Sequence, residues 1–302
     1  MSTGIDLSQL AAPDIIETLD YESILAELHA DVVALMPSLA AVLALESEPI
    51  NVVLQAAAYR ELNWRARVNA AARARMLAYA TGSDLDHIGA GYNLARLVTA
   101  AGDATAVPPV EPTLETDDDF RSRIQASPDA WASAGPASAY RARTLNASGD
   151  VLSAVASPHT PSPGDVTVAV LSRSGDGTAS AALLATVYAA LTDADVRPIN
   201  DTVFVQSAQI LSYPLIAELV LYPGPSSAPV LAAAQAAAVA YTTETHRLGY
   251  DVTPAGLYAA LRQPGVQDVH ITSPVGARVT AGWNQAPYCT GITLTVSATT
   301  DV

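Results

Sequence analysis

The stretch "NVVLQAAAYRELNWRARVNAAARARMLAY", residues 51–79, decides how this chain is organised. It holds neither glycine nor proline and is rich in Ala, Leu and Arg, which are good helix formers. We therefore predict one long helix from about Asn51 to Tyr79. The preceding stretch "YESILAELHADVVALM" (21–36) also has helical spacing, with Asp20 suited to cap its start and Pro37 to follow its end.

The apolar residues of these two helices are more numerous than a small helical core needs. Two or three helices bury little surface, so we expect part of this surface to await a partner. The residues concerned are Ile24, Leu28, Val32, Leu35, Val53, Tyr59, Leu62, Trp64 and Val68.

Charge changes sign between the two helices. Residues 1–50 contain nine acidic residues and no Arg, whereas residues 51–79 contain Glu61 alone against five arginines: Arg60, Arg65, Arg67, Arg73 and Arg75. Two interpretations remain open. The charges are either two solvated helix faces, or complementary surfaces that pack within one chain or between chains.

Composition excludes several classes of protein. The 302 residues include 30 acidic and 15 basic ones, all of the latter Arg, for a net charge of −15. Such a chain is not expected to bind nucleic acid, because phosphate binding needs basic surface. The single cysteine, Cys289, allows no internal disulfide. Neither a signal peptide nor a membrane span is expected, since even the apolar stretch 228–241 is too short, and the protein should be soluble when made.

The rest of the chain predicts an α+β arrangement of several modules. Residues 165–171 and 215–222 alternate as strands do, and residues 180–193 and 228–246 have the pattern of helices. Residues 100–116 are expected to form a linker, because Pro108, Pro109 and Pro112 oppose both a helix and a central strand. We therefore divide the chain into a helical assembly arm (1–79), a short helix with a proline-rich linker (80–116), and α+β modules (117–302).

An internal repeat is also expected among these modules. Residues 137–158 resemble residues 255–274, with Tyr140 aligned to Tyr258 and Asp150 to Asp268 at one offset. Each copy predicts a helix, a polar turn and a strand.

The stretch "ATGSDLDHIGAGY" (80–92) has both a structural and a chemical interpretation. Ser83 and Asp86 form a pattern close to a capping box, so we predict that Ser83 caps a helix, with Asp84 in its first turn and Gly82 at a sharp entry. Alternatively, Asp84, Asp86 and His87 would bind the metal of a hydrolase. A third ligand would have to come from elsewhere, and the other histidines form no ligand pair at helical spacing. The favoured expectation is that no metal binds here.

Other signals of catalysis are absent from the sequence. It has no G-x-S-x-G elbow and no Walker A loop, "GAGYNL" lacks the third glycine of a dinucleotide fingerprint, and Cys289 has no neighbouring His. We therefore expect no catalytic, cofactor-binding or metal-binding residue, no cofactor and no enzymatic activity.

An ordered series of segments resembles the baseplate J-like family of contractile-tailed bacteriophages, most closely its members from small temperate phages. The segments include "LDYESILAEL", "LESEPINVVLQAAAYRELNWRARVNAAARARML", "GSDLDHIGAGYNLARL", "VLSRSGDGTAS", "DVRPINDTVFVQSA", "HRLGYDV" and "LYAALRQPGVQDV". The resemblance covers nearly the whole chain.

This resemblance implies a structural role in the wedges of the tail baseplate, with rearrangement of the wedges triggering sheath contraction. The implied partners are a second copy of the chain, a tail protein I-like subunit, a lysozyme-like W-type baseplate subunit and the neighbouring wedges around the hub. The protein would be found in the virion after assembly in the host cytoplasm. Besides the hydrolase, the remaining alternative is a host-binding tail protein, although fibre repeats are absent from the sequence.

Overall fold

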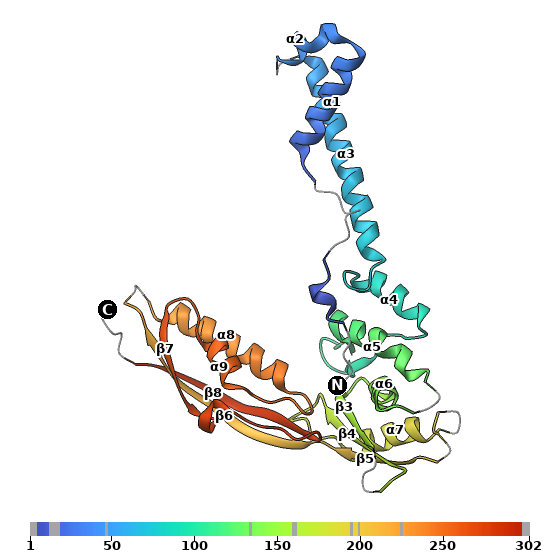
Figure 1. The fold of residues 1–302 in the computed structure, drawn as a ribbon, viewed down its shortest axis with the longest axis vertical. Coiled ribbons are helices and arrows are strands. Elements are labelled where there is room, and N and C mark those ends of the chain that lie inside the picture. The colour runs from blue at the N-terminus through green and yellow to red at the C-terminus, as the bar shows by residue number, and fades with distance from the viewer. Residues whose placement is uncertain are drawn as a thin grey trace. The chain divides into compact units, whose positions relative to one another are not determined.

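The computed structural model describes residues 5–11, 19–45, 48–132, 135–158, 162–193, 196–198, 200–223 and 226–297. Its secondary structure is α+β, as expected, with helices first (Figure 1). The chain divides into two compact units. One runs up to Ala95 and includes Asp117–Ile124, and the other comprises Arg96–Thr116 and the chain from Gln125 onward. In the described part of the chain, every helix is too short or too polar to cross a membrane.

The first unit is built on two helices that lie side by side, α1 (Tyr21–Leu35) and α3 (Pro49–Ala74) (Figure 1). As predicted, Asp20 occupies the N-cap of α1, where its carboxylate accepts a hydrogen bond from the Glu22 N–H at 3.1 Å. The long helix is also confirmed, although it ends about one turn before the predicted Tyr79. Shorter helices complete this part: η1 (Leu7–Gln9), η2 (Pro37–Leu39) and α2 (Ala40–Leu43).

A small core forms where α4 (Gly82–Gly91) meets the start of α5 (Asp117–Ala130). Its fully buried residues are Ala80, Leu85, Phe120 and Ile124. Gly89 lies directly against Phe120, and a Cβ added there would be only 2.3 Å from the Phe120 Cζ.

The predicted cap of α4 is wrong. The helix begins one residue before Ser83, and Thr81 occupies the N-cap position. The N–H of Gly82 instead donates to the Asp117 Oδ2 at 3.1 Å, so an acceptor 35 residues away serves this helix end. Gly82 has a φ of 52°, which fits the sharp entry expected of it.

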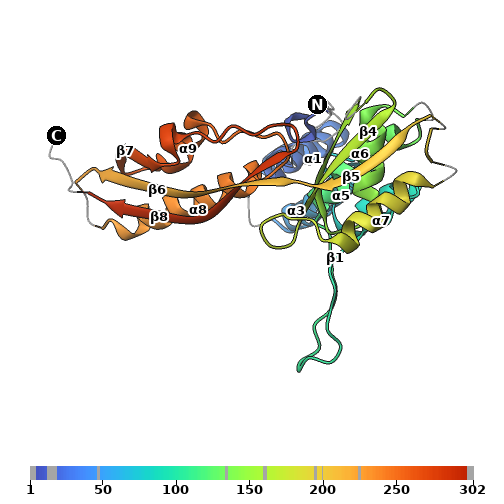
Figure 2. The ribbon, with the colours of Figure 1, turned by 90° about the horizontal axis from the view of Figure 1, so that it is seen from below.

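The proline-rich stretch that was expected to be an irregular connector forms a hairpin. Strand β1 (Val98–Ala100) pairs antiparallel with β2 (Thr113–Leu114), and Asp103 and Val110 exchange backbone hydrogen bonds of 2.8 and 2.9 Å. Figure 2 shows this hairpin projecting from β1. Proline is tolerated here because both strands of a two-stranded ribbon are edge strands. On the outer side of an edge strand, no neighbouring strand needs the N–H that proline lacks.

The central module contains a three-stranded sheet in the order β3-β4-β5. Helix α6 (Ala137–Ala147) leads into β3 (Val151–Pro158), which pairs antiparallel with β4 (Asp165–Ser172). Helix α7 (Ala181–Thr192) then crosses over to β5 (Thr202–Ser207), which pairs parallel with β4. Alternate residues of β4 enter two different cores, because successive side chains of a strand point to opposite faces.

The C-terminal module repeats this arrangement in the order β7-β6-β8. Strand β6 (Gln209–Leu221) pairs antiparallel with β7 (Val266–Ser273) and parallel with β8 (Gln285–Val296). Helices α8 (Ala228–Thr245) and α9 (Pro254–Leu261) lie between β6 and β7 in the chain, and η3 (Val275–Ala277) follows β7. The alternation predicted for residues 215–222 is confirmed, since its inward positions are at most 3% exposed: Leu215, Ala217, Leu219 and Leu221.

The predicted helix–turn–strand units are both present, as α6–β3 and α9–β7. In each sheet the strand after the helix, β3 or β7, pairs antiparallel with the central strand, β4 or β6. The central strand pairs parallel with the remaining strand, β5 or β8. The order of the elements along the chain differs between the modules. The aligned tyrosines also differ, since Tyr140 is 1% exposed and Tyr258 is 42% exposed.

Candidate assembly surface

The inner face of α3 combines apolar residues, with Ala58 at 0% exposed, with buried polar ones. It is formed by residues at helical spacing, among which Asn51 and Asn69 are buried. The Asn51 side-chain amide donates to the backbone carbonyls of Leu43 and Leu45, at 3.1 and 2.6 Å, and so holds the end of α2. Hydrogen bonds from Asn51 therefore add to the apolar packing of this inner face.

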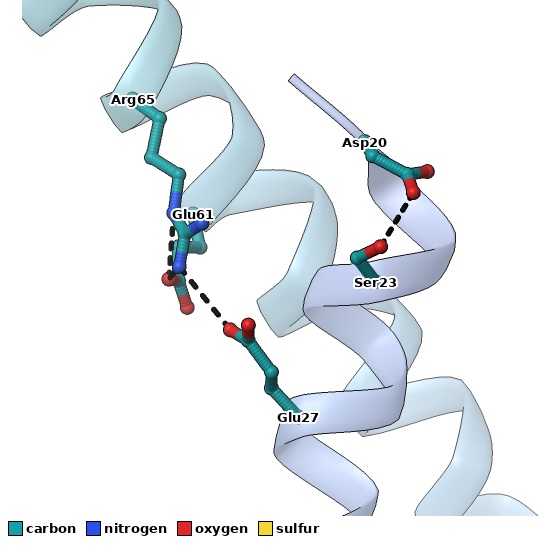
Figure 3. A network of polar contacts seen from close by, with 5 residues as sticks. All are labelled: Asp20, Ser23, Glu27, Glu61 and Arg65. Atoms are coloured by element: carbon teal, nitrogen blue, oxygen red, sulfur yellow. Dashed lines mark hydrogen bonds and ion pairs between the residues drawn. The ribbon is translucent and has the colours of Figure 1, made fainter. Parts of the chain in front are cut away.

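Arg65 links the two helices on this side (Figure 3). Its Nε donates to Glu61 Oε1 at 3.0 Å within α3, and its Nη2 lies 3.4 Å from Glu27 Oε2 of α1. Near the start of α1 the Ser23 hydroxyl donates to Asp20 and lowers the pKa of that carboxyl group. The acidic first helix and the basic second helix thus contact each other within one chain through Arg65 and Glu27. This contact agrees with the interpretation of the charges as complementary surfaces.

The opposite face of α3 presents apolar side chains to solvent. Val53, Trp64 and Val68 are 67%, 65% and 61% exposed. Ala57 and Ala71 lie on the same side of the helix, and Arg60 and Arg67 lie among them. We call this surface the outer stripe, and it consists of Val53, Ala57, Arg60, Trp64, Arg67, Val68 and Ala71.

The outer stripe leaves apolar side chains in solvent, although α3 also buries apolar residues on its inner side, where Ala58 is 0% exposed. A surface helix normally buries its apolar face. Exposed apolar residues that form a continuous stripe, rather than single positions, indicate an interaction site. Leu35, at the end of α1, is another exposed apolar residue of this arm, at 87%.

Two of the arginines singled out in the sequence also belong to this stripe. Arg60 and Arg67 are exposed, and the Arg67 guanidinium lies 5.6 Å from the centre of the Trp64 ring. Arg65 belongs to the inner face instead. In the sequence, all five arginines of residues 51–79 were grouped together, although helical spacing already separates Arg65 from Arg60 and Arg67.

A shallow hollow lies at the junction of α1 and α2. It has a volume of about 360 Å³ and is lined by His29, Ala30, Val33, Ala40, Leu43 and Ala44. Among the described residues, His29 Nε2 is a buried nitrogen without a hydrogen-bond partner. The hollow therefore offers an apolar pocket with one polar group.

The residues of the hydrolase alternative lie on the surface of α4. Asp84, Asp86 and His87 are all exposed, and Asp84 sits in the first turn, where negative charge suits the helix dipole. Within the described ranges, no three His, Cys, Asp or Glu residues are grouped so that they could hold a metal ion. Cys289 is half-buried in β8, with its thiol 3.4 Å from the Gly291 carbonyl.

Comparison with known proteins accounts for most of the chain. Residues 46–103 match the model of the baseplate J-like N-terminal domain, and residues 132–207 match that of the baseplate J-like central domain. The chain is 48% identical over 291 residues to baseplate protein J of Escherichia phage P2, and the alignment covers 95% of each protein. The first match contains α3 and its outer stripe, and the second contains the central module.

Proposed function

The chain belongs to the baseplate J-like family, and from this premise we propose that it is a structural component of a phage tail baseplate. Its place would be the wedge of the baseplate in the virion, after assembly in the host cytoplasm. Rearrangement of the wedges would then trigger contraction of the sheath. We propose no catalytic role.

We further propose that residues 1–79 are the assembly arm. The observation that carries this proposal is the outer stripe, where Val53, Trp64 and Val68 are exposed on the side of α3 away from its buried residues. The stripe runs from Val53 to Ala71 and is long enough to be covered by a segment of a partner. The partners proposed for the arm are a second copy of the chain and a tail protein I-like subunit in a helical bundle, while a W-type subunit and the neighbouring wedges would contact the rest.

The test is co-expression of the chain with a tail protein I-like subunit, followed by native mass measurement of the complex. Trp64→Ser with Val68→Ser should weaken assembly at least about tenfold, since a buried aromatic anchor contributes 2 kcal/mol or more. The matched control is Tyr188→Ser with Val239→Ser, at helix positions that are 50% and 47% exposed outside the arm. Normal assembly of the stripe variant would contradict the proposal.

Removing residues 1–79 should give a soluble fragment that melts cooperatively and no longer forms wedges. The small core of α4 and α5 survives this cut, because its four buried residues begin at Ala80. If the fragment still assembles wedges, the joining surface lies outside the arm.

Metal analysis of the purified chain tests the competing hydrolase hypothesis. We expect no stoichiometric zinc, calcium or manganese after dialysis. A bound metal that is lost in Asp84→Ala would favour the hydrolase.

A further inference from the structure

The hairpin of residues 98–114, here called the finger, is firmly held at its base. The N–H of Leu97 donates to Glu115 Oε1 at 3.0 Å, and the Arg96 guanidinium donates to the Glu115 carbonyl at 3.0 Å. A Cβ at Gly149 would lie 2.1 Å from the Val98 carbonyl oxygen, so the α6–β3 turn packs tightly against the base. The finger is therefore anchored to the central module by close contacts.

Beyond its base, the finger contributes almost nothing to the protein's own core. Its apolar residues Val98, Val107, Val110 and Leu114 are 49%, 98%, 56% and 48% exposed. A two-stranded hairpin alone is marginally stable in water. Gly102 nevertheless fits a close approach of the two strands, since a Cβ there would be 2.4 Å from the Val110 carbonyl oxygen. An ordered, exposed and apolar hairpin of this kind suits contact with another surface.

The chemistry of the finger limits what that surface is. Pro108, Pro109 and Pro112 lack an N–H, so the finger is a poor template for added strands and must be recognised through side chains. Residues 97–119 contain acidic side chains, including Asp103 and Glu111, and no basic ones. A matching surface would be apolar and aromatic, to pack on proline, and cationic.

The outer stripe has these properties. A chain of net charge −15 repels its own copies over most of its surface, but residues 51–79 carry five arginines against one glutamate. Arg60 and Arg67 flank the exposed Trp64. From Val53 to Ala71 the stripe is roughly 27 Å long at 1.5 Å per residue, and the finger reaches roughly 30 Å from Val98 to Val107 at 3.3 Å per residue.

We propose that the finger of one copy lies along the outer stripe of a second copy. This inference rests on the proposed function, because it names which part of the second copy covers a section of the arm.

Cysteine cross-linking within assembled wedges tests the contact. Two differently tagged copies, both with Cys289→Ser, are co-expressed with the tail protein I-like subunit. One carries Val107→Cys, and the other carries Ala57→Cys or Ala71→Cys, so each copy holds a single thiol. Oxidation should join the two tags. In the matched control, Val275→Cys replaces Val107→Cys at a position that is 91% exposed, and no such product should form.

Each outcome decides the matter. Wedges that assemble without the Val107 product, or with an equal Val275 product, overturn the docking proposal and leave the proposed function standing. A product that forms only when both thiols are in one copy shows docking within a chain and also overturns it. Failure of the unsubstituted chains to form wedges overturns both.

A charge exchange provides a second readout. Glu111→Arg alone and Arg67→Glu alone should each reduce the cross-linked product about two- to fivefold, the range expected for one exposed ion pair. Together, in the two copies, they should restore it. Independent losses without restoration would contradict the pairing of finger and stripe.

Discussion

Replacing Gly89 by alanine should loosen the contact between α4 and α5 by about 1–2 kcal/mol. The new Cβ would lie 2.3 Å from the Phe120 Cζ and 2.8 Å from its Cε1, whereas carbon atoms pack best at about 3.5–4.0 Å. The Phe120 ring would have to move by more than about 1 Å. It is fully buried among Leu85 and Ile124, which are themselves at most 1% exposed.

The magnitude follows from two opposing effects. Overpacking a closed core costs about 1–3 kcal/mol, and a contact of 2.3 Å with a fully buried ring belongs to the upper part of that range, about 2–3 kcal/mol. Alanine in a helix offsets up to about 1 kcal/mol of this, because glycine loses more backbone entropy on folding. The net loss of about 1–2 kcal/mol corresponds to a roughly 5- to 30-fold larger open population.

Hydrogen exchange read by mass spectrometry is the suitable assay, because it reports local opening without assuming that the whole chain unfolds in one step. Amides of α4 and of the start of α5 should exchange about 5- to 30-fold faster in Gly89→Ala. Gly91→Ala is the matched control in the same helix, since its Cβ would meet nothing within 4 Å and exchange should stay equal or slow down.

A double substitution separates the overlap from other causes. Phe120→Leu replaces the ring that the new Cβ meets by a shorter side chain. The effects of Phe120→Leu and Gly89→Ala on the exchange rate should therefore be less than additive. Unchanged or slower exchange in Gly89→Ala would show that the ring has room to move, and the reasoning from the overlap would be refuted.

Gly177→Ala should lower the urea midpoint of unfolding more than Gly175→Ala. Both glycines have a positive φ, 98° and 64°, but only at Gly177 would the added Cβ crowd a neighbour, at 2.5 Å from the Leu171 Cδ1. Equal midpoints would contradict this. Thr253→Ala removes the N-cap of α9 and should cost about 1 kcal/mol, seen as faster hydrogen exchange in that helix but not in α7. Burial raises the pKa of Tyr140 above its ordinary value of 10.0, so the folded protein keeps a proton that the unfolded chain releases. Stability should therefore be fully present below about pH 10 and fall above it, and Tyr140→Phe should flatten this fall in unfolding curves; an unchanged slope would contradict the argument.

Much of the secondary structure follows from local sequence. Asp20 and Pro37 bracket α1 because a capping carboxylate and a residue without an N–H act on the helix end next to them. The alternation in residues 215–222 places the inward side chains of β6 in the core whichever strands are its neighbours. The composition of residues 51–79 likewise suffices for a long helix.

The candidate surface could be predicted only in part from the sequence. Its apolar residues and its arginines could be named, and their helical spacing can be read from the sequence. Which side of α3 stays exposed depended on the neighbours of the helix. Asn51 donates to the carbonyls of Leu43 and Leu45. Arg65 lies against Glu27 of α1. Helical periodicity identifies faces, but it does not say which face a neighbour covers.

By itself, then, the sequence determined where most helices and strands form, their order, and the family resemblance, because propensity, capping and periodicity act over a few residues. Tertiary structure decided the rest. It replaced the predicted Ser83 cap of α4 by a carboxylate from Asp117, and it paired the proline-rich residues 98–114 into a hairpin. It also paired β5 with β4 and β8 with β6 in parallel. Each of these choices joins residues far apart in the chain, so each depends on which long-range contacts repay the entropy of closing the intervening loop.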